Sequence, residues 1–276
     1  MEFLYSCDES GITITKWIGD AKKAIIPRKI EGKPVIKIAD YAFSDNLAIK
    51  KVVINANLEV IGDFSFQFCE KLENINLPQT VRYIGESAFE GCISLKEVNI
   101  PPIKHINKSA FEECSSLICV EIPSSVEVID ERAFEFCLNL REVTMHEGVQ
   151  EIRNGAFFCC RRLKYFHMPD SVVKTGKEIL LGCRKLETVH LSKSLEKIEI
   201  GLLARCRELK KIEIPGSVKI ICNGAFAECS SCNKFVLGDK NIRIGVRVFE
   251  GCNELLNDKE FVVSMKKHLE NTHGEK

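Results

Sequence analysis

Three features are absent from this sequence of 276 residues. No apolar run approaches the roughly 18 residues of a membrane-spanning helix, so we expect no insertion into a membrane. Neither sign of charge is in excess, since Lys plus Arg and Asp plus Glu both number 39, which argues against nucleic acid and other polyanions as partners. The opening residues Met1–Asp8 lack a basic start, a long apolar stretch and a small-residue cleavage site. We therefore expect no export of the chain as written.

A repeated phrase, Ala-Phe-x-x-Cys, dominates what is present. Its Phe-type positions are 23 residues apart, except for one interval of 22. Each segment of such an array is one unit that buries its apolar face only by stacking on its neighbours. We therefore predict one elongated solenoid and seek function on its surface rather than in a pocket. The Phe-type positions are Phe43, Phe66, Phe89, Phe111, Phe134, Phe157, Leu180, Leu203, Phe226 and Phe249.

Other columns keep the same register. An Ile-type residue stands five positions before each Phe-type position, with Thr175 as the exception. A Cys stands three positions after it in every copy but the first, and a Leu follows three residues later in most copies. Next comes an alternating run that ends in Pro, as in Ile75-Asn76-Leu77-Pro78, which predicts a short strand.

These columns predict a mainly β fold. Successive strands should be parallel, about 4.8 Å apart and bonded only to the next coil, forming one concave sheet. The convex side has too few residues for long helices, so we expect short strands, turns or single 3₁₀ turns there. We expect a hairpin cap at residues 1–24, about ten repeats over 25–252, and a cap helix and tail at 253–276. The helix should begin at Asp258 and bury Phe261, Val262, Met265 and Leu269.

The repeat resembles the BspA-like type of leucine-rich repeat over roughly residues 12–252. The Ile-Pro-x-Ser-Val piece at Ile122–Val126 and Ile214–Val218 carries this resemblance. The opening segment Ile12–Trp17, with Ile26-Pro27 after it, is similar to the usual entry of such arrays. The resemblance implies a right-handed solenoid and a non-enzymatic binding protein, often found on or outside the cells of host-associated microbes.

Nine of the fourteen cysteines fall in one column. Stacked equivalents about 4.8 Å apart are close enough for disulfides, but their parallel Cβ vectors oppose bridging. We interpret the column as small buried core residues in a reducing compartment, and so predict a cytoplasmic location with a secreted or cell-surface one as the alternative. Cys229 and Cys232 have the spacing of half a zinc knuckle, with Cys222 nearby in sequence, yet no second pair completes a site, so we predict no metal.

Residues on either side of the inward position of each strand should face the concave surface. His167 and His190 are neighbours in this register, beside Tyr165. The alternatives for this patch are a ligand-contact surface, a metal site, a catalytic site and ordinary solvated variation; no nucleophile with a base is suggested by spacing. The candidate binding residues are Glu142, Thr144, Tyr165, His167, Thr188, His190, Lys211 and Glu213.

These observations lead to one principal hypothesis and one alternative. We expect a non-catalytic scaffold, monomeric and without cofactor, that binds a protein partner along the concave sheet. The alternative is a secreted or surface-exposed adhesin that binds a host protein or glycan. An enzyme is disfavoured.

Overall fold

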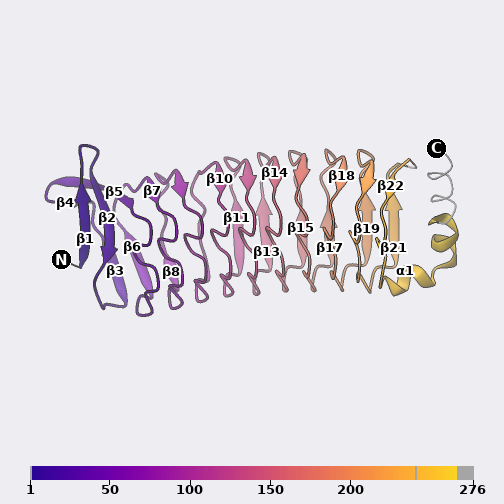
Figure 1. Ribbon diagram of the computed structural model, residues 1–276, viewed down its shortest axis with the longest axis horizontal. Helices are drawn as coiled ribbons and strands as arrows, with labels where there is room; N and C mark the ends of the chain where they lie inside the picture. The colour runs from indigo at the N-terminus through magenta and orange to yellow at the C-terminus, as the bar shows by residue number, and fades with distance from the viewer. Residues whose placement is uncertain (1, 240, 266–276) are drawn as a thin grey trace.

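The chain forms a stack of parallel-stranded coils in the computed structural model, which describes residues 2–239 and 241–265. Figure 1 shows the coils following one another along a single long axis, with β1 and α1 at opposite ends of the rod. The mainly β solenoid expected from the repeat is therefore confirmed. Its right-handed sense and the concavity of its sheet stay predictions.

The expected hairpin opens the chain. Strands β1 (Phe3–Cys7) and β2 (Ile12–Trp17) pair antiparallel, and the Asp8 carboxylate accepts the backbone N–H of Ser10 at 2.8 Å in the turn. Strand β2 then pairs in parallel with β5 (Lys33–Ile38), which also pairs antiparallel with β4 (Lys29–Ile30). The Phe3 and Trp17 rings lie 4.9 Å apart by centroid, and Trp17 stacks on Phe43 of the first coil. The hairpin thus joins the core, while its role as a cap stays a prediction.

One series of strands, which we call the strand face, follows the Leu column in each coil except the one that contains Leu95. Its residues alternate between buried and exposed, as the burial of β11, β13 and β19 shows. The series comprises β3 (Lys23–Ile26), β6 (Lys51–Ile54), β8 (Asn74–Ile75), β11 (Cys119–Ile122), β13 (Glu142–Met145), β15 (Tyr165–His167), β17 (Thr188–His190), β19 (Lys211–Ile214) and β21 (Lys234–Leu237).

The predicted single sheet is interrupted on this face. Hydrogen-bonded ladders join β3-β6-β8, β11-β13, β15-β17 and β19-β21 separately. One cause is asparagine: the side chain of Asn76 accepts the Ile54 N–H at 2.9 Å and donates to the Ile54 carbonyl at 3.2 Å, and Asn99 donates to the Leu77 carbonyl at 3.0 Å. These amides occupy backbone groups that the next strand would otherwise bond. The Asn76 contact ends the β6–β8 ladder at Ile75, the Asn99 contact lies between this coil and the next, and pairing on this face resumes at Cys119.

A second ladder of short strands follows the Ile column, as expected for the other side of the coil. Its members pair in parallel within β5-β7-β9, β10-β12-β14-β16 and β18-β20-β22. After β5 they are two residues long: β7 (Val60–Ile61), β9 (Tyr83–Ile84), β10 (His105–Ile106), β12 (Val128–Ile129), β14 (Glu151–Ile152), β16 (Lys174–Thr175), β18 (Lys197–Ile198), β20 (Ile220–Ile221) and β22 (Arg243–Ile244).

Turns rather than 3₁₀ helices complete each coil in the part of the chain that the structure describes. Two residues per coil adopt the left-handed region, two positions before and two after the Phe-type residue, as Phe64 (φ 55°) and Phe68 (φ 55°) do around Phe66. The N–H groups of these three residues donate to carbonyls of the next coil over 2.9, 2.8 and 2.7 Å. The turns therefore bond coil to coil as the strands do.

The core is built from the predicted columns. The rings of Phe66 and Phe89 are parallel within 3°, with centroids 5.2 Å apart, and the stack continues without a break from Phe43 to Phe157. The Ile and Leu columns are buried beside it. Burying each Phe contributes about 1.5–3 kcal/mol, which a fold made only of neighbour contacts requires.

The cysteine column is buried, as predicted, and it also forms hydrogen bonds that the sequence did not suggest. Each of the nine thiols lies within hydrogen-bond distance of the carbonyl of the Phe-type residue in the preceding coil; the Sγ of Cys92, for example, is 3.2 Å from the Phe66 carbonyl oxygen. All fourteen cysteines are free thiols. The column is thus a ladder of weak S–H donors as well as a row of small core residues.

Helical structure is confined to the C-terminal end of the described chain. Helix α1 (Asn253–Asn257) buries Leu255, and a second helical segment runs over residues 259–265, where the description ends. The Asp258 carboxylate accepts the N–H groups of Glu260 (2.9 Å) and Phe261 (3.2 Å), so the predicted N-cap is confirmed. Phe261 packs edge-on against Phe249. Leu269, the last residue of the predicted apolar stripe, lies outside the described residues.

Candidate functional site

The eight candidate residues lie on four successive strands of the strand face. They occupy the outward positions, while Val143, Phe166, Val189 and Ile212 between them are buried. Strands β13, β15, β17 and β19 follow one another in chain order along the rod in Figure 1. Alternation of apolar and polar residues was therefore enough to place Glu142, Thr144, Tyr165, His167, Thr188, His190, Lys211 and Glu213 on one surface.

Parallel pairing of β15 with β17 places equivalent residues of the two strands opposite each other. Tyr165 is opposite Thr188, and His167 is opposite His190. The two imidazole rings lie 5.8 Å apart by centroid and are tilted by 59°. Tyr165 exposes 60% of its surface, so its ring and phenol group are available to a partner. These four side chains form the centre of the candidate site.

The charged residues of the site lie on β19. Lys211 and Glu213 form an ion pair along the strand, on the same face as the histidines. The hydrogen bond from Lys211 lowers the pKa of Glu213 against the opposing effect of burial, and the positive charges of Lys211 and Lys234 lower this pKa further. Glu213 is therefore ionised at neutral pH and already has a partner. Displacing Lys211 from it would expose a carboxylate to an incoming basic group.

Glu142 and Thr144 form the opposite side of the site. Strand β13 pairs with β11 so that Glu142 lies opposite Cys119 and Thr144 lies opposite Glu121. Both candidate residues are exposed. The site is therefore continuous with β11 and extends toward the N-terminal half of the rod.

Two further parts of this surface were not among the predicted residues. His146 follows β13 and its Nε2 lies 2.9 Å from a carboxylate oxygen of Glu121. Three residues after β15, Asp170 pairs with Lys193 at 3.1 Å and accepts its backbone N–H at 3.0 Å, contacts that lower the pKa of Asp170. His146 lies two residues after Thr144, so the same alternation could have identified it. The Asp170 pair depends on a turn that no sequence pattern specified.

The positions of the His and Cys side chains can be compared with those that a metal site requires. Among residues 2–239 and 241–265, no group of three or more His, Cys, Asp or Glu side chains is arranged to hold a metal ion. The thiol of Cys229 is 3.2 Å from the Leu203 carbonyl and that of Cys232 is 3.5 Å from the Lys234 carbonyl. Both are buried, whereas Cys222 directly follows β20 and its side chain is partly exposed. Core packing accounts for the zinc-like spacing.

Comparison with known proteins identifies the repeat. A family model described as BspA type leucine rich repeat region, with six copies, matches residues 36–164 and 150–267. No curated protein matches the sequence. Among the described residues, no helix has both the length and the apolar character needed to cross a bilayer.

Solved structures of bacterial leucine-rich repeat proteins are similar to the chain over most of its length. A leucine rich cell surface protein from Faecalibacterium prausnitzii is 21% identical, with 95% of each chain covered and a TM-score of 0.45. The leucine rich repeat protein of T. pallidum is 23% identical, with 97% of this chain and 93% of that chain covered and a TM-score of 0.44. The pneumococcal vaccine antigen PcpA is 18% identical, with 91% and 78% covered and a TM-score of 0.45.

Proposed function

Because the chain belongs to the BspA-type leucine-rich repeat family, we propose that it is a non-catalytic scaffold that binds a protein partner along its strand face. The observation that supports this proposal is a difference between the buried and the exposed positions of each coil. Positions that recur from coil to coil are buried, whereas positions that vary lie exposed on adjacent strands. Exposed side chains that differ from coil to coil on a constant framework are suited to recognising a partner.

The chemistry of the surface fits a protein partner. Tyrosine is enriched at protein interfaces because it combines a large apolar ring with a hydroxyl group, and Tyr165 is the most exposed aromatic residue on this face. The imidazoles of His167 and His190 can donate or accept hydrogen bonds beside it. Glu213 and Lys211 provide both signs of charge one coil further on.

The dimensions of the site indicate how far the contact extends. Four strands at about 4.8 Å spacing, each about four residues long, cover roughly 14 Å by 13 Å. A stable interface usually buries about 800 Å² on each partner, several times this area. We therefore propose that the candidate residues form the centre of a longer contact that includes β11 and β21 on either side.

Capture from lysates of the native cell tests the assignment. The immobilised full chain is compared with a variant in which Tyr165, His167 and His190 are all replaced by Ala. We expect the variant to lose at least about 10-fold in recovery of one or more specific partners, which corresponds to about 1.4 kcal/mol. Equal recovery of every partner would overturn the assignment of the patch.

The chain offers a matched control on its other ladder. Tyr83 and His105 are exposed, lie on adjacent coils and belong to two-residue strands. The Tyr83→Ala/His105→Ala variant removes the same side-chain types as a Tyr165→Ala/His190→Ala variant. We expect the control to retain the partner and the strand-face variant to lose it. Circular dichroism of both variants verifies that the coils remain folded.

Location separates the scaffold from the alternative adhesin. Fourteen free thiols, most of them in one buried column, favour a reducing compartment, since extracellular proteins rich in cysteine usually pair them. We therefore propose a cytoplasmic scaffold. Fractionation of the native cell tests this: recovery of the chain from the cell surface, with its exposed cysteines oxidised, would favour the adhesin.

A further inference from the structure

The charges on one edge of the rod are segregated along its length. This edge, which we call the turn edge, consists of the turns that follow each Phe-type residue. In the turns after Phe89, Phe111 and Phe134 it carries four carboxylates and no basic residue: Glu90, Glu112, Glu113 and Glu135. We call these turns the acidic stretch; Arg132 and Glu131, just before Phe134, border it.

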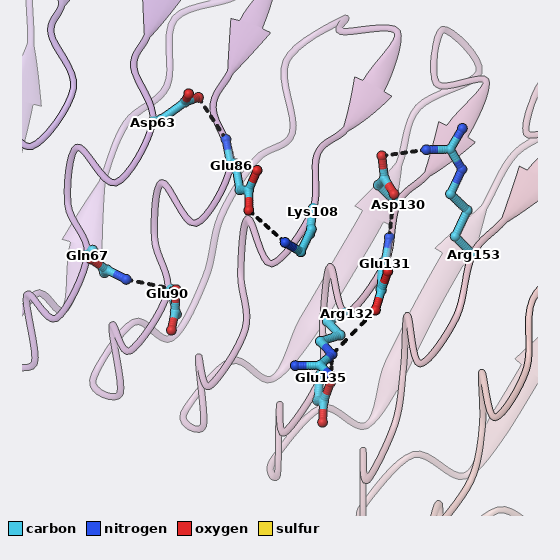
Figure 2. Close-up of polar contacts among 10 residues, drawn as sticks. All are labelled: Asp63, Gln67, Glu86, Glu90, Lys108, Asp130, Glu131, Arg132, Glu135 and Arg153. Atoms are coloured by element: carbon cyan, nitrogen blue, oxygen red, sulfur yellow. Dashed lines mark hydrogen bonds and ion pairs between the residues drawn. The ribbon is translucent and has the colours of Figure 1, made fainter.

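Contacts within the acidic stretch do not neutralise it. Figure 2 shows Arg132 reaching Glu131 and Glu135 at 3.7 and 3.4 Å, and Gln67 donating to Glu90 at 2.9 Å. Burial, followed by the negative charge of Glu112, raises the pKa of Glu135 to about 7. One guanidinium is therefore shared by two carboxylates, and the other three carboxylates of the stretch have no cation at ion-pair distance among the described residues.

The next coils of the same edge carry the opposite charge. Arg161, Arg162 and Arg184 are exposed, and none has a carboxylate at ion-pair distance in the part of the chain that the structure describes. Lys185 pairs with Glu208, while Arg205 and Arg207 share Glu228 at 3.0 and 3.5 Å. Six basic side chains thus face two carboxylates. The excess of positive charge equals the excess of negative charge in the acidic stretch.

An apolar centre lies between the two stretches. Phe136 and Phe158 are partly exposed and contact each other edge-on, with ring centroids 5.6 Å apart. Leu138, in the same coil as Phe136, and Leu181, in the coil after that of Phe158, are also partly exposed. An apolar centre with charged residues around it is the usual composition of a protein interface.

Most charges of the two stretches are too far apart to neutralise each other within one chain; Glu135 and Arg161, on adjacent coils and both acting on the pKa of Cys159, are the exception. Glu112 and Arg184 are three coils apart, or about 14 Å at 4.8 Å per coil. The Debye length at physiological ionic strength is about 8 Å, so their attraction is largely screened. Both charges therefore remain available to another molecule.

We propose that two copies of this chain associate antiparallel through the turn edge, about a two-fold axis near Phe136 and Phe158. This operation places the acidic stretch of each copy on the basic stretch of the other, and the aromatic pair against its own equivalent. A two-fold interface is self-complementary, as this edge is. A foreign acidic partner would match only the basic half and leave the carboxylates unpaired.

Sedimentation equilibrium of the full chain tests the proposal. Above about pH 8, where Glu135 is ionised, and at about 0.1 M salt, we expect a concentration-dependent mass that approaches twice 31.2 kDa. Raising the salt to about 1 M should weaken association by at least about 10-fold. A chain that stays at 31.2 kDa at every concentration would overturn the proposal.

Charge reversal provides the sharper test. The basic reversal, Arg161→Glu/Arg184→Glu, and the acidic reversal, Glu112→Lys/Glu135→Lys, should each be monomeric. Mixing the two variants, or combining all four changes in one chain, should restore the dimer. The control Arg82→Glu/Arg243→Glu alters two exposed arginines on the side of the second ladder, one just before β9 and one in β22, and should leave the dimer unchanged.

The outcomes distinguish this inference from the proposed function. If the single reversals dimerise as well as the original chain, or if the combined chain stays monomeric while its circular dichroism is unchanged, the two-fold contact is wrong. Partner capture by the strand face would be unaffected, because Tyr165, His167 and His190 lie on another side of the coil. Loss of capture in their variant would in turn leave the dimer intact.

Discussion

At the residue scale, one rule of the sequence becomes visible only in the structure. Wherever Asp or Asn stands three positions before a Phe-type residue, the next coil has Gly four positions before its own. The Asp63 carboxylate accepts the Glu86 N–H at 3.0 Å, and a Cβ on Gly85 would lie 2.3 Å from that carboxylate. The carboxylate can occupy this position only because the residue opposite it in the next coil has no Cβ. The four pairs are Asp40 and Gly62, Asp63 and Gly85, Asn154 and Gly176, and Asn223 and Gly245.

This rule predicts a cost for adding one methyl group. Gly85→Ala should destabilise the chain by about 1–3 kcal/mol, because backbone atoms of Asp63 as well as its side chain lie under 3.0 Å from the new Cβ. Urea denaturation measures the change. Adding Asp63→Ala should recover part of the loss, since the two residues are coupled. Gly216→Ala, where the nearest atom would be at 3.6 Å, is the control and should be close to neutral.

Glu135 predicts a pH dependence of stability. Burial and Glu112 raise the pKa of Glu135 to about 7 in the folded chain, from 4.5, against the weaker opposing effect of Arg132. The folded state therefore binds this proton more tightly than the unfolded state, and stability is lost as pH rises through about 7. The groups facing Glu135 are Glu112, Glu113, Glu131, Arg132 and, from the next coil, Cys159.

Glu135→Gln should remove that loss. Because the carboxyl is only half-buried, we expect a gain of about 1 kcal/mol near pH 8 and no gain near pH 4, measured by urea denaturation at low protein concentration. Glu70→Gln changes an exposed carboxylate three coils away and serves as the control. A gain that is equal at both pH values would contradict the assignment.

At the element scale, the position of a cysteine in the fold determines whether its thiol reacts. Burial raises the pKa of the Cys92, Cys114 and Cys160 thiols well above the ordinary value, so they stay protonated and unreactive. In the native chain at about pH 8, a disulfide reagent should modify at most four thiols, and in denaturant all fourteen. Rapid reaction of the column in the native state would contradict the ladder. The four accessible thiols are Cys7, Cys119, Cys159 and Cys222.

The elements that the sequence predicted are those set by periodic burial. The Phe, Ile, Leu and Cys columns, the hairpin around Asp8 and the Asp258 N-cap follow from local patterns, and all are present. The candidate residues were placed on one face for the same reason: strands alternate with a period of two.

Other elements depended on contacts between coils. The β6–β8 ladder ends where the side chain of Asn76 bonds the backbone of Ile54, a contact with the preceding coil that the sequence around Asn76 does not predict. The left-handed turns hold large residues such as Phe136 (φ 56°) and Arg132 (φ 57°) rather than Gly, because bonding to adjacent coils outweighs their local preference. Because the net charge is zero, the composition gave no sign that acidic and basic residues are segregated along the turn edge. The monomer was therefore predicted without taking these charges into account.

At the scale of the whole molecule, stability depends on the continuity of the stack. Phe134 lies between Phe111 and Phe157, with ring centroids 5.4 and 5.3 Å away. Phe134→Ala should cost about 3–5 kcal/mol and separate the unfolding of the two halves, since each coil contacts only its neighbours. Hydrogen exchange measured on both sides of residue 134 detects the separation.

Phe134→Leu is the matched variant, because Leu180 and Leu203 occupy the equivalent position in two native coils. We expect it to cost about 1 kcal/mol and to keep a single cooperative transition. Two separate transitions in the Leu variant, or one in the Ala variant, would show that coupling along the rod does not pass through this column.

Hydroxyl-radical footprinting of the chain alone and with its captured partner tests the central claim most directly. Tyr165, His167 and His190 react readily when exposed, and Tyr83 and His105 on the second ladder report the rest of the surface. We predict that the partner protects the first three residues and leaves the last two unchanged. Protection of Tyr83 and His105 with full reactivity at Tyr165, His167 and His190 would contradict recognition by the strand face.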